Sequence, residues 1–323
     1  MLATILPFFL VANITVNDPH RQSEWATYGP EYTYNVLVNM SLANIVREDD
    51  NFCVMMATEL KCRPKGEDSL SCRFQNSQIK RPDPSYNRCS NAKDFVPTKY
   101  KFVGDEPFEI RFNPKGIENL VVPRSIPRWR LDMIKVIVSQ LNVGFEVRER
   151  RDKFTIMENS TVGHCEVDVK IIRQSFTEND DDSTEKSESF EIGFMPPGEE
   201  LGHTSIVERF QVEKVRHPKR CPRRTIYFFG DYEDYSHGDK QVYMDMITSM
   251  SHITISKDEF VSYTISEGIM KTANKSRTMR PYQKISLKLK GIDLARSSLP
   301  EILNPASTSL FAFSNLQTIL QKK

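Results

Sequence analysis

The sequence predicts a mainly β protein in which a β barrel wraps around one central, apolar helix. Segments with alternating apolar residues recur along most of the chain, and residues typical of turns separate them. Residues 129–141 break this rhythm, because their apolar residues have helical spacing and cover most sides of the helix. Such a helix has to be buried on most sides. A buried helix among many strands indicates a sheet that wraps around it.

The strands are predicted from β-forming residues and from the turns between them. Residues 32–40 alternate and are rich in β-branched and aromatic side chains. Residues 51–62 and 70–75 are expected to form a hairpin, because Pro64 and Gly66 mark a turn between them. The pattern continues in residues 108–112, 117–122, 226–229, 253–255, 260–265 and 285–290. Regularly spaced strands of this kind are typical of a barrel or a sandwich.

The helix is predicted from an apolar stripe with a start and a stop signal. Pro127 lies near its first turn, where a missing N–H costs little, and Gly144 follows its end, where a left-handed residue is often needed. The stripe consists of Met133, Ile134, Ile137, Val138 and Leu141. We expect Ile134, Ile137, Val138 and Leu141 to be buried inside the barrel.

Composition and motifs exclude several classes of protein. The chain has 323 residues, of which 39% are hydrophobic and 27% charged, and its formal net charge is +1. These values exclude a collagen, a disulfide-stapled miniprotein and a globally disordered chain, and they give no reason to expect nucleic acid as a partner. The sequence contains no catalytic or phosphate-binding motif, and its six histidines are scattered without ligand spacing. We therefore expect neither an enzyme nor a bound cofactor or metal.

The N-terminus predicts secretion. Residues 2–16 carry no charge, and this run is too short for a membrane span of ~20 residues. It suits the apolar core of a signal peptide, with Ala12 as a small residue at a possible cleavage site. The alternative is a buried first strand, and Pro7 argues against it. We expect residues 1–12 to be a signal peptide and the secreted chain to have no transmembrane segment.

The cysteines and the glycosylation motifs agree with secretion. The six cysteines are Cys53, Cys62, Cys72, Cys89, Cys165 and Cys221, and they allow fifteen connectivities. Cys62 and Cys72 flank the predicted turn at nearly equal distances, so we expect them to pair across the hairpin. Asn39, Asn159 and Asn274 begin Asn-x-Ser/Thr motifs and are candidate glycan acceptors.

Two charged segments stand out. Residues 177–189 are acidic and lack apolar side chains, which predicts a loop. Residues 213–224 contain a group of basic side chains, namely Lys214, Arg216, Lys219, Arg220, Arg223 and Arg224. They form either a solvated strand end, which is the commoner case, or a docking patch for an acidic partner.

Several segments, taken in chain order, match one known family. Trp25-Ala-Thr-Tyr-Gly-Pro-Glu-Tyr-Thr-Tyr resembles the first strand of the vitellogenin N-terminal domain, which the large lipid transfer proteins share. Residues 107–122, 127–142, 157–167, 221–230 and 299–308 resemble, in turn, its hairpin, its central helix, its two cysteine segments and the end of its barrel. The resemblance runs from about Trp25 to Phe313 and leaves residues 314–323 as a tail.

The resemblance implies a fold, a disulfide and a partner. It implies a β barrel around one helix over residues 25–313 and a disulfide between Cys165 and Cys221, which leaves Cys53 to pair with Cys89. It also implies binding to a lipoprotein receptor whose acidic repeats contact a basic strand before the second cysteine. Lys214 and Arg216 occupy that place and share one face of a strand, because they are two residues apart. Lys219, Arg220, Arg223 and Arg224 would widen the patch.

The family's larger members continue into domains that line a lipid cavity, whereas this sequence stops at Lys323. We therefore expect a secreted, vitellogenin-like protein reduced to its N-terminal barrel, which binds a receptor or another partner and is not a bulk lipid carrier. The alternative is a direct carrier of small lipids. That role needs a void in the barrel, which the apolar helix is expected to fill.

Overall fold

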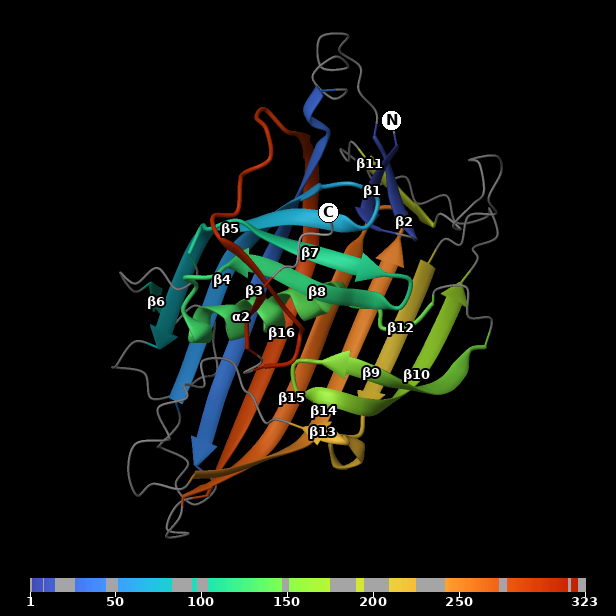
Figure 1. The fold of residues 1–323 in the computed structure, drawn as a ribbon. Coiled ribbons are helices and arrows are strands. Elements are labelled where there is room, and N and C mark those ends of the chain that lie inside the picture. Colours follow the sequence, from blue (N-terminus) through green and yellow to red (C-terminus); the bar gives the residue numbers. More distant parts are fainter. Residues whose placement is uncertain are drawn as a thin grey trace.

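The computed structural model describes residues 2–7, 9–14, 27–44, 52–82, 95–97, 104–146, 151–174, 190–194, 209–224, 242–272, 278–312 and 315–318. Most of these residues form strands of one large antiparallel sheet that curves over helix α2 (Figure 1). The predicted mainly β fold is confirmed. The predicted strand at 226–229 and the acidic loop at 177–189 lie outside the described residues.

The large sheet is built from long, alternating strands. In chain order they are β3 (Pro30–Asn44), β4 (Phe52–Pro64), β5 (Ser69–Pro82), β6 (Phe95–Pro97), β7 (Phe108–Asn113), β8 (Gly116–Pro123), β9 (Lys153–Ser160), β10 (Gly163–Gln174), β12 (Arg209–Arg216), β13 (Arg223–Arg224), β14 (Val242–Ser256), β15 (Phe260–Thr272), β16 (Thr278–Leu294), β17 (Pro305–Thr308) and β18 (Gln317–Thr318). Their spatial order is β13-β10-β12-β14-β15-β16-β3-β4-β5-β7-β8-β17-β18, with β9 beside β10 and β6 beside β5.

The sheet is not closed into a barrel. Its order ends at β13 on one side and at β18 on the other, and no pairing joins these ends within the described ranges. The expectation of a barrel around a central helix is therefore corrected to an open, curved sheet. Alternating apolar residues show which segments form strands and which residues of a strand share a face. Closure depends on the tilt and stagger of all strands together, which alternation does not contain.

Helix α2 (Arg128–Val138) continues into the 3₁₀-helix η2 (Ser139–Leu141) and lies against the concave side of the sheet (Figure 1). It contacts β16, while η2 contacts β8, β15 and β16. Residues 131–138 are all buried. Ile134, Ile137, Val138 and Leu141 belong to the main core, so their predicted burial is confirmed.

The β4–β5 hairpin has the predicted disulfide. Cys62 and Cys72 are directly opposed in the register, and a disulfide joins them across a sequence separation of 10. Gly66 has a φ of +79° in the turn, a conformation that residues with a Cβ rarely adopt. Cys53 is also disulfide-bonded, and its expected partner, Cys89, lies outside the described residues.

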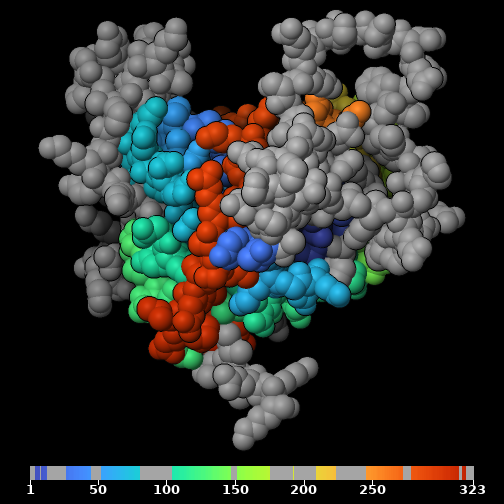
Figure 2. All heavy atoms as spheres, turned by 90° about the horizontal axis from the view of Figure 1, so that it is seen from above, coloured from blue at the N-terminus to red at the C-terminus, as the bar shows by residue number. Residues whose placement is uncertain are grey.

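The C-terminal segment that follows β16 is fastened to other strands of the same sheet. Arg63 on β4 donates hydrogen bonds to the carbonyls of Ser297, at 2.7 Å, and of Tyr28, at 2.8 Å. Further along, β17 pairs with β8, which extends the sheet. In Figure 2, this segment, coloured red, crosses the face of the molecule beside the cyan and green strands.

The first residues form strands in the structure of the full chain. β1 (Leu2–Leu6) and β2 (Leu10–Ile14) make a hairpin, which β11 (Phe190–Phe194) joins to give a three-stranded sheet. Several side chains of the hairpin, namely Ile5, Leu6, Leu10 and Ala12, are buried in the main core. Pro7 lies in the turn and interrupts neither strand, which removes the objection to a buried strand. The signal peptide at residues 1–12 stays a prediction.

Candidate functional site

β12 lies between β10 and β14, and it brings the two predicted receptor-binding residues to one face of the sheet. Along β12, Phe210, Val212 and Lys214 are buried, whereas Val215 is exposed. Lys214 and Arg216 therefore share a face, as predicted, but it is the face that packs on the interior. Their side chains are only 4% and 9% exposed.

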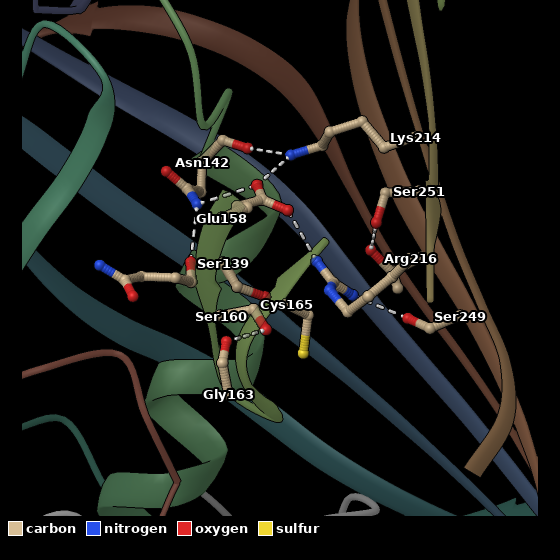
Figure 3. A network of polar contacts seen from close by, with 12 residues as sticks. Ser139, Asn142, Glu158, Ser160, Gly163, Cys165, Lys214, Arg216, Ser249 and Ser251 are labelled. Atoms are coloured by element: carbon tan, nitrogen blue, oxygen red, sulfur yellow. Dashed lines mark hydrogen bonds and ion pairs between the residues drawn. The ribbon is translucent and has the colours of Figure 1, made fainter. Parts of the chain in front are cut away.

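The two cations meet one buried carboxylate. Glu158 on β9 accepts from Lys214 Nζ at 2.5 Å through Oε1 and from Arg216 Nη2 at 2.9 Å through Oε2 (Figure 3). Lys214 Nζ also donates to the backbone carbonyls of Asn142, at 2.9 Å, and Val143, at 3.1 Å. Three acceptors around one amine need three N–H donors, so Lys214 is in its charged, ammonium form.

Burial and charge act in opposite directions on these groups. Burial tends to raise the pKa of Glu158, but Lys214 and Arg216 outweigh this effect and hold the pKa below its ordinary value. Burial lowers the pKa of Lys214, and the attraction of Glu158 opposes part of that shift. The carboxylate is therefore ionised at neutral pH and balances only one of the two cations.

A glycine lets Glu158 reach this position. Gly144 follows η2 and has a φ of +84°, as expected for a left-handed residue close to the end of the helix. A Cβ at this residue would lie 2.3 Å from Glu158 Oε1, which is inside van der Waals contact. Asn142 Nδ2 also donates to Glu158 Oε1, at 3.3 Å. The loop after η2 thus closes over the carboxylate.

The prediction that Lys214 and Arg216 form the centre of a receptor-facing patch is wrong. Both side chains point inward and are occupied by Glu158, so an acidic partner on the surface cannot contact Lys214. The sequence contained a signal for this, because Phe210 and Val212 lie on the same face of the strand as Lys214, whereas Gln211 and Glu213 lie on the other. Sequence reasoning also missed Glu158, although it starts the motif E-x-x-x-x-G-x-C-x-V that ends in β10.

The remaining basic residues lie beyond the end of β12. Lys219 and Arg220 are exposed in the 3₁₀-helix η3 (Pro218–Arg220), and Arg220 pairs with Glu166. This hydrogen-bonded pair raises the pKa of Arg220. Arg223 and Arg224 form β13, whose backbone pairs with the start of β10, and their side chains lie outside the described set.

A disulfide holds η3 against the sheet. Cys165 on β10 is bonded to Cys221, which follows η3, as the resemblance implied. Cys165 also packs with Val162 and Met246 in a small apolar cluster, and Cys221 lies against this cluster. The exposed Lys219 and Arg220 are therefore attached to a fixed part of the protein.

The predicted glycan acceptors have different surroundings. Asn159 on β9 is exposed, and its Oδ1 lies 2.8 Å from His164 Nδ1. Asn39 lies within β3, and its Oδ1 is buried without a hydrogen-bond partner in the described part of the chain. Asn274 lies outside the described residues. Glycosylation at all three stays a prediction.

A small cavity of about 40 Å³, with both polar and apolar walls, adjoins the charge cluster. Glu158, Lys214 and Arg216 line it, together with Gln140 and Thr264 and several serines of η2, β14 and β15. A buried water needs about 10–15 Å³ on this measure, so the cavity has room for two or three water molecules. Pockets for organic ligands are commonly about 300–1,000 Å³. An acyl chain therefore does not fit here.

The described residues offer no metal site and no helical membrane span. No three His, Cys, Asp or Glu side chains converge within them in the way that a metal ion requires. None of the helices in these ranges is long and apolar enough to cross a membrane.

The open, curved sheet is similar to that of a protein of known structure. A solved structure titled "Lipid-protein interactions in lipovitellin" aligns with 92% of this chain and 28% of its own, at a TM-score of 0.55 and 11% sequence identity. Residues 27–286 match the Vitellogenin N-terminal domain family, and the chain belongs to that family. Its members are lipid transport proteins and not enzymes.

The chain is also similar in sequence to a vitellogenin. Vitellogenin-A1 of Aedes aegypti is 25% identical over 247 residues, which are 68% of this chain and 11% of that protein. The chain thus spans a small part of the proteins that it matches.

Proposed function

We propose that this chain acts outside the cell, in lipid transport, as a partner-binding domain. The observation that carries the proposal is that Lys214 and Arg216 of β12, which were expected on the surface, face the interior. Both side chains are enclosed, whereas Val215 is exposed on the outer face of the strand, and Lys219 and Arg220 are exposed in η3, which follows it. The disulfides agree with an oxidising, extracellular compartment.

The described interior does not suit bulk lipid. α2 fills the concave side of the sheet with apolar side chains that are already buried. The cavity beside it is about 40 Å³, and its wall includes three charged side chains and several hydroxyl groups beside apolar ones. Lipid tails need apolar surroundings, because burial of polar groups without partners is costly. This part of the chain would therefore contribute to lipid transport through binding at its outer surface.

The proposed interface is the β12–β14 patch, which consists of Val215, Ile247 and Met250 with Lys219 and Arg220 at its edge. Val215 and Met250 are opposed in the register of β12 and β14, and both are exposed, by 40% and 53%. Ile247 is 50% exposed on the same strand as Met250, and η3 contacts that strand. Apolar side chains with a polar rim are the usual arrangement of a protein interface.

The basic edge favours an acidic partner. Lys219 and Arg220 are held at the surface by the Cys165–Cys221 disulfide, so their charges keep a defined place. Charge complementarity of this kind speeds association and selects partners of opposite sign. A lipoprotein receptor with acidic repeats has the chemistry required, and the family resemblance favours it.

Binding of the secreted chain to immobilised acidic receptor repeats tests the proposal. Met250→Glu adds a like charge to the centre of the patch, and Lys219→Glu with Arg220→Glu reverses its edge. Each change should weaken binding at least tenfold, while Leu303→Glu, at a side chain that is 73% exposed elsewhere, should leave it unchanged. Binding by the wild type should also weaken with added salt, because exposed charges are screened beyond ~8 Å at physiological ionic strength.

Two results would contradict the proposal. Equal affinity of all these versions would remove the β12–β14 patch from binding. Stoichiometric displacement of a fluorescent fatty acid from the wild-type chain would favour the small-lipid carrier instead.

A further inference from the structure

We propose that the cavity beside Arg216 binds a small monovalent anion, such as chloride or the carboxylate of formate. The inference concerns the inner side of β12 and does not depend on the proposed partner of the outer side. It rests on the net charge of the cavity wall, on an unpaired donor of Arg216 and on the size and chemistry of the cavity.

The wall of the cavity carries one more positive than negative charge. Its charged side chains are Glu158, Lys214 and Arg216, and its other described lining residues are uncharged. All three are at most 9% exposed. An uncompensated charge that is largely removed from water is unfavourable. A monoanion in the cavity would bring the sum of the charges to zero.

Arg216 has a donor available for such an anion. Its Nη2 donates to Glu158 Oε2 at 2.9 Å, and its Nη1 donates to Ser249 Oγ at 2.8 Å. Its Nε is buried and has no hydrogen-bond partner in the described part of the protein. A guanidinium group can only donate hydrogen bonds, so the missing partner has to be an acceptor.

Hydroxyl groups occupy places on the inner face where a sheet normally presents apolar side chains. Ser249, Ser251, Ser262, Thr264 and Ser266 line the cavity from β14 and β15. Ser251 and Thr264 are 2.8 Å apart across the two strands, and Thr264 donates to Gln140 Oε1 at 3.0 Å. Hydroxyl groups rotate and can present their hydrogens to an anion.

The size and charge of the cavity limit the anion to a small one. About 40 Å³ holds two or three water molecules on the usual measure, and a halide with one water fits the same space. A doubly charged anion would overcompensate a net charge of one, and a large monoanion such as gluconate does not fit. The cavity therefore selects for small monoanions.

Thermal unfolding of the full chain at constant ionic strength provides the test. Sodium chloride and sodium formate are each titrated against sodium gluconate. The melting temperature of the wild type should rise with at least one of the small anions and then saturate. In Arg216→Gln the apparent affinity for that anion should fall at least tenfold. Arg280→Gln changes an exposed arginine of β16 and should titrate like the wild type.

Either of two results would overturn the proposal. The first is equal melting temperatures in chloride, formate and gluconate. The second is an anion effect that Arg216→Gln and Arg280→Gln both retain with the affinity of the wild type, which would place the bound anion elsewhere on the protein. If Arg216→Gln does not fold, crystals of the wild-type chain soaked in sodium bromide decide the question by anomalous scattering. A bromide peak within hydrogen-bonding distance of Arg216 supports the site, and peaks restricted to the surface overturn it.

Discussion

Replacing Glu158 by glutamine should destabilise the protein far more than any surface ion pair would suggest. The carboxylate is 2% exposed and holds two cations at 2.5 and 2.9 Å. Glutamine keeps the volume but leaves Lys214 and Arg216 as uncompensated buried charges. Removing one partner from a buried pair typically costs about 3–5 kcal/mol. We expect a loss in this range in the free energy of unfolding, measured by urea denaturation.

Glu166→Gln is the matched control. Glu166 lies on the neighbouring strand β10 and pairs with Arg220, but the two side chains are 29% and 65% exposed. An exposed pair contributes about 0–1 kcal/mol, because water already solvates both charges. A loss below about 1 kcal/mol for Glu158→Gln, or equal losses for both variants, would refute the reasoning that the cluster is desolvated. Combining Glu158→Gln with Lys214→Met should destabilise less than the sum of the single changes, because it also removes one of the two buried cations that Glu158→Gln leaves without a counter-charge.

The pH dependence gives a second measure of the same cluster. The pKa of Glu158 is lowered in the folded state, so its contribution is present above the unfolded pKa of about 4.3. That contribution is lost as the pH falls through the lower, folded pKa. Between pH 7 and pH 3, the wild type should therefore lose more stability than Glu158→Gln. Parallel curves for the two proteins would contradict this prediction.

Further predictions concern the disulfide, the helix and a second buried lysine. Replacing both Cys165 and Cys221 by alanine opens a loop with a sequence separation of 56 and should cost about 4 kcal/mol in the chain-entropy model; an unchanged melting temperature would contradict it. Ile137→Ala in α2 should cost about 2–5 kcal/mol in urea unfolding, because the core relaxes only partly into the space, and a loss below about 1 kcal/mol would refute its burial. Burial lowers the pKa of Lys135 from 10.5 to about 8 despite Asp132 beside it, so the unfolded chain binds more protons between these values. Stability should therefore rise with pH across this window in the wild type relative to Lys135→Met, and an equal slope in both would contradict the assignment.

Local patterns were enough to predict much of the fold. The period of two indicated the strands, and the helical spacing of Ile134, Ile137 and Val138 indicated a helix that is buried. The Cys62–Cys72 disulfide was predicted because the two cysteines lie at nearly equal distances in the sequence from the turn between them. These features depend on residues that are close in the sequence, so a single sequence contains the information.

The tertiary structure decided which distant strands pair and where the sheet ends. Residues 2–14 have the composition of a signal core, yet their turn at Pro7 and a distant strand, β11, allow them to form part of a sheet. The two ends of the large sheet remain unpaired in the described chain, although each strand has the pattern of a barrel strand.

β12 shows the physical reason most clearly. Its sequence determined that Lys214 and Arg216 share one face and Val215 the other. Phe210 and Val212 lie on the face of Lys214 and favour its burial, but a buried lysine also needs partners, which its own strand does not supply. Here Glu158 of β9 and the carbonyls of Asn142 and Val143, which are distant in the sequence, surround the lysine and offset the cost of burying it. The face of Phe210, Val212 and Lys214 therefore packs on the interior, and Glu213 and Val215 lie on the outer face.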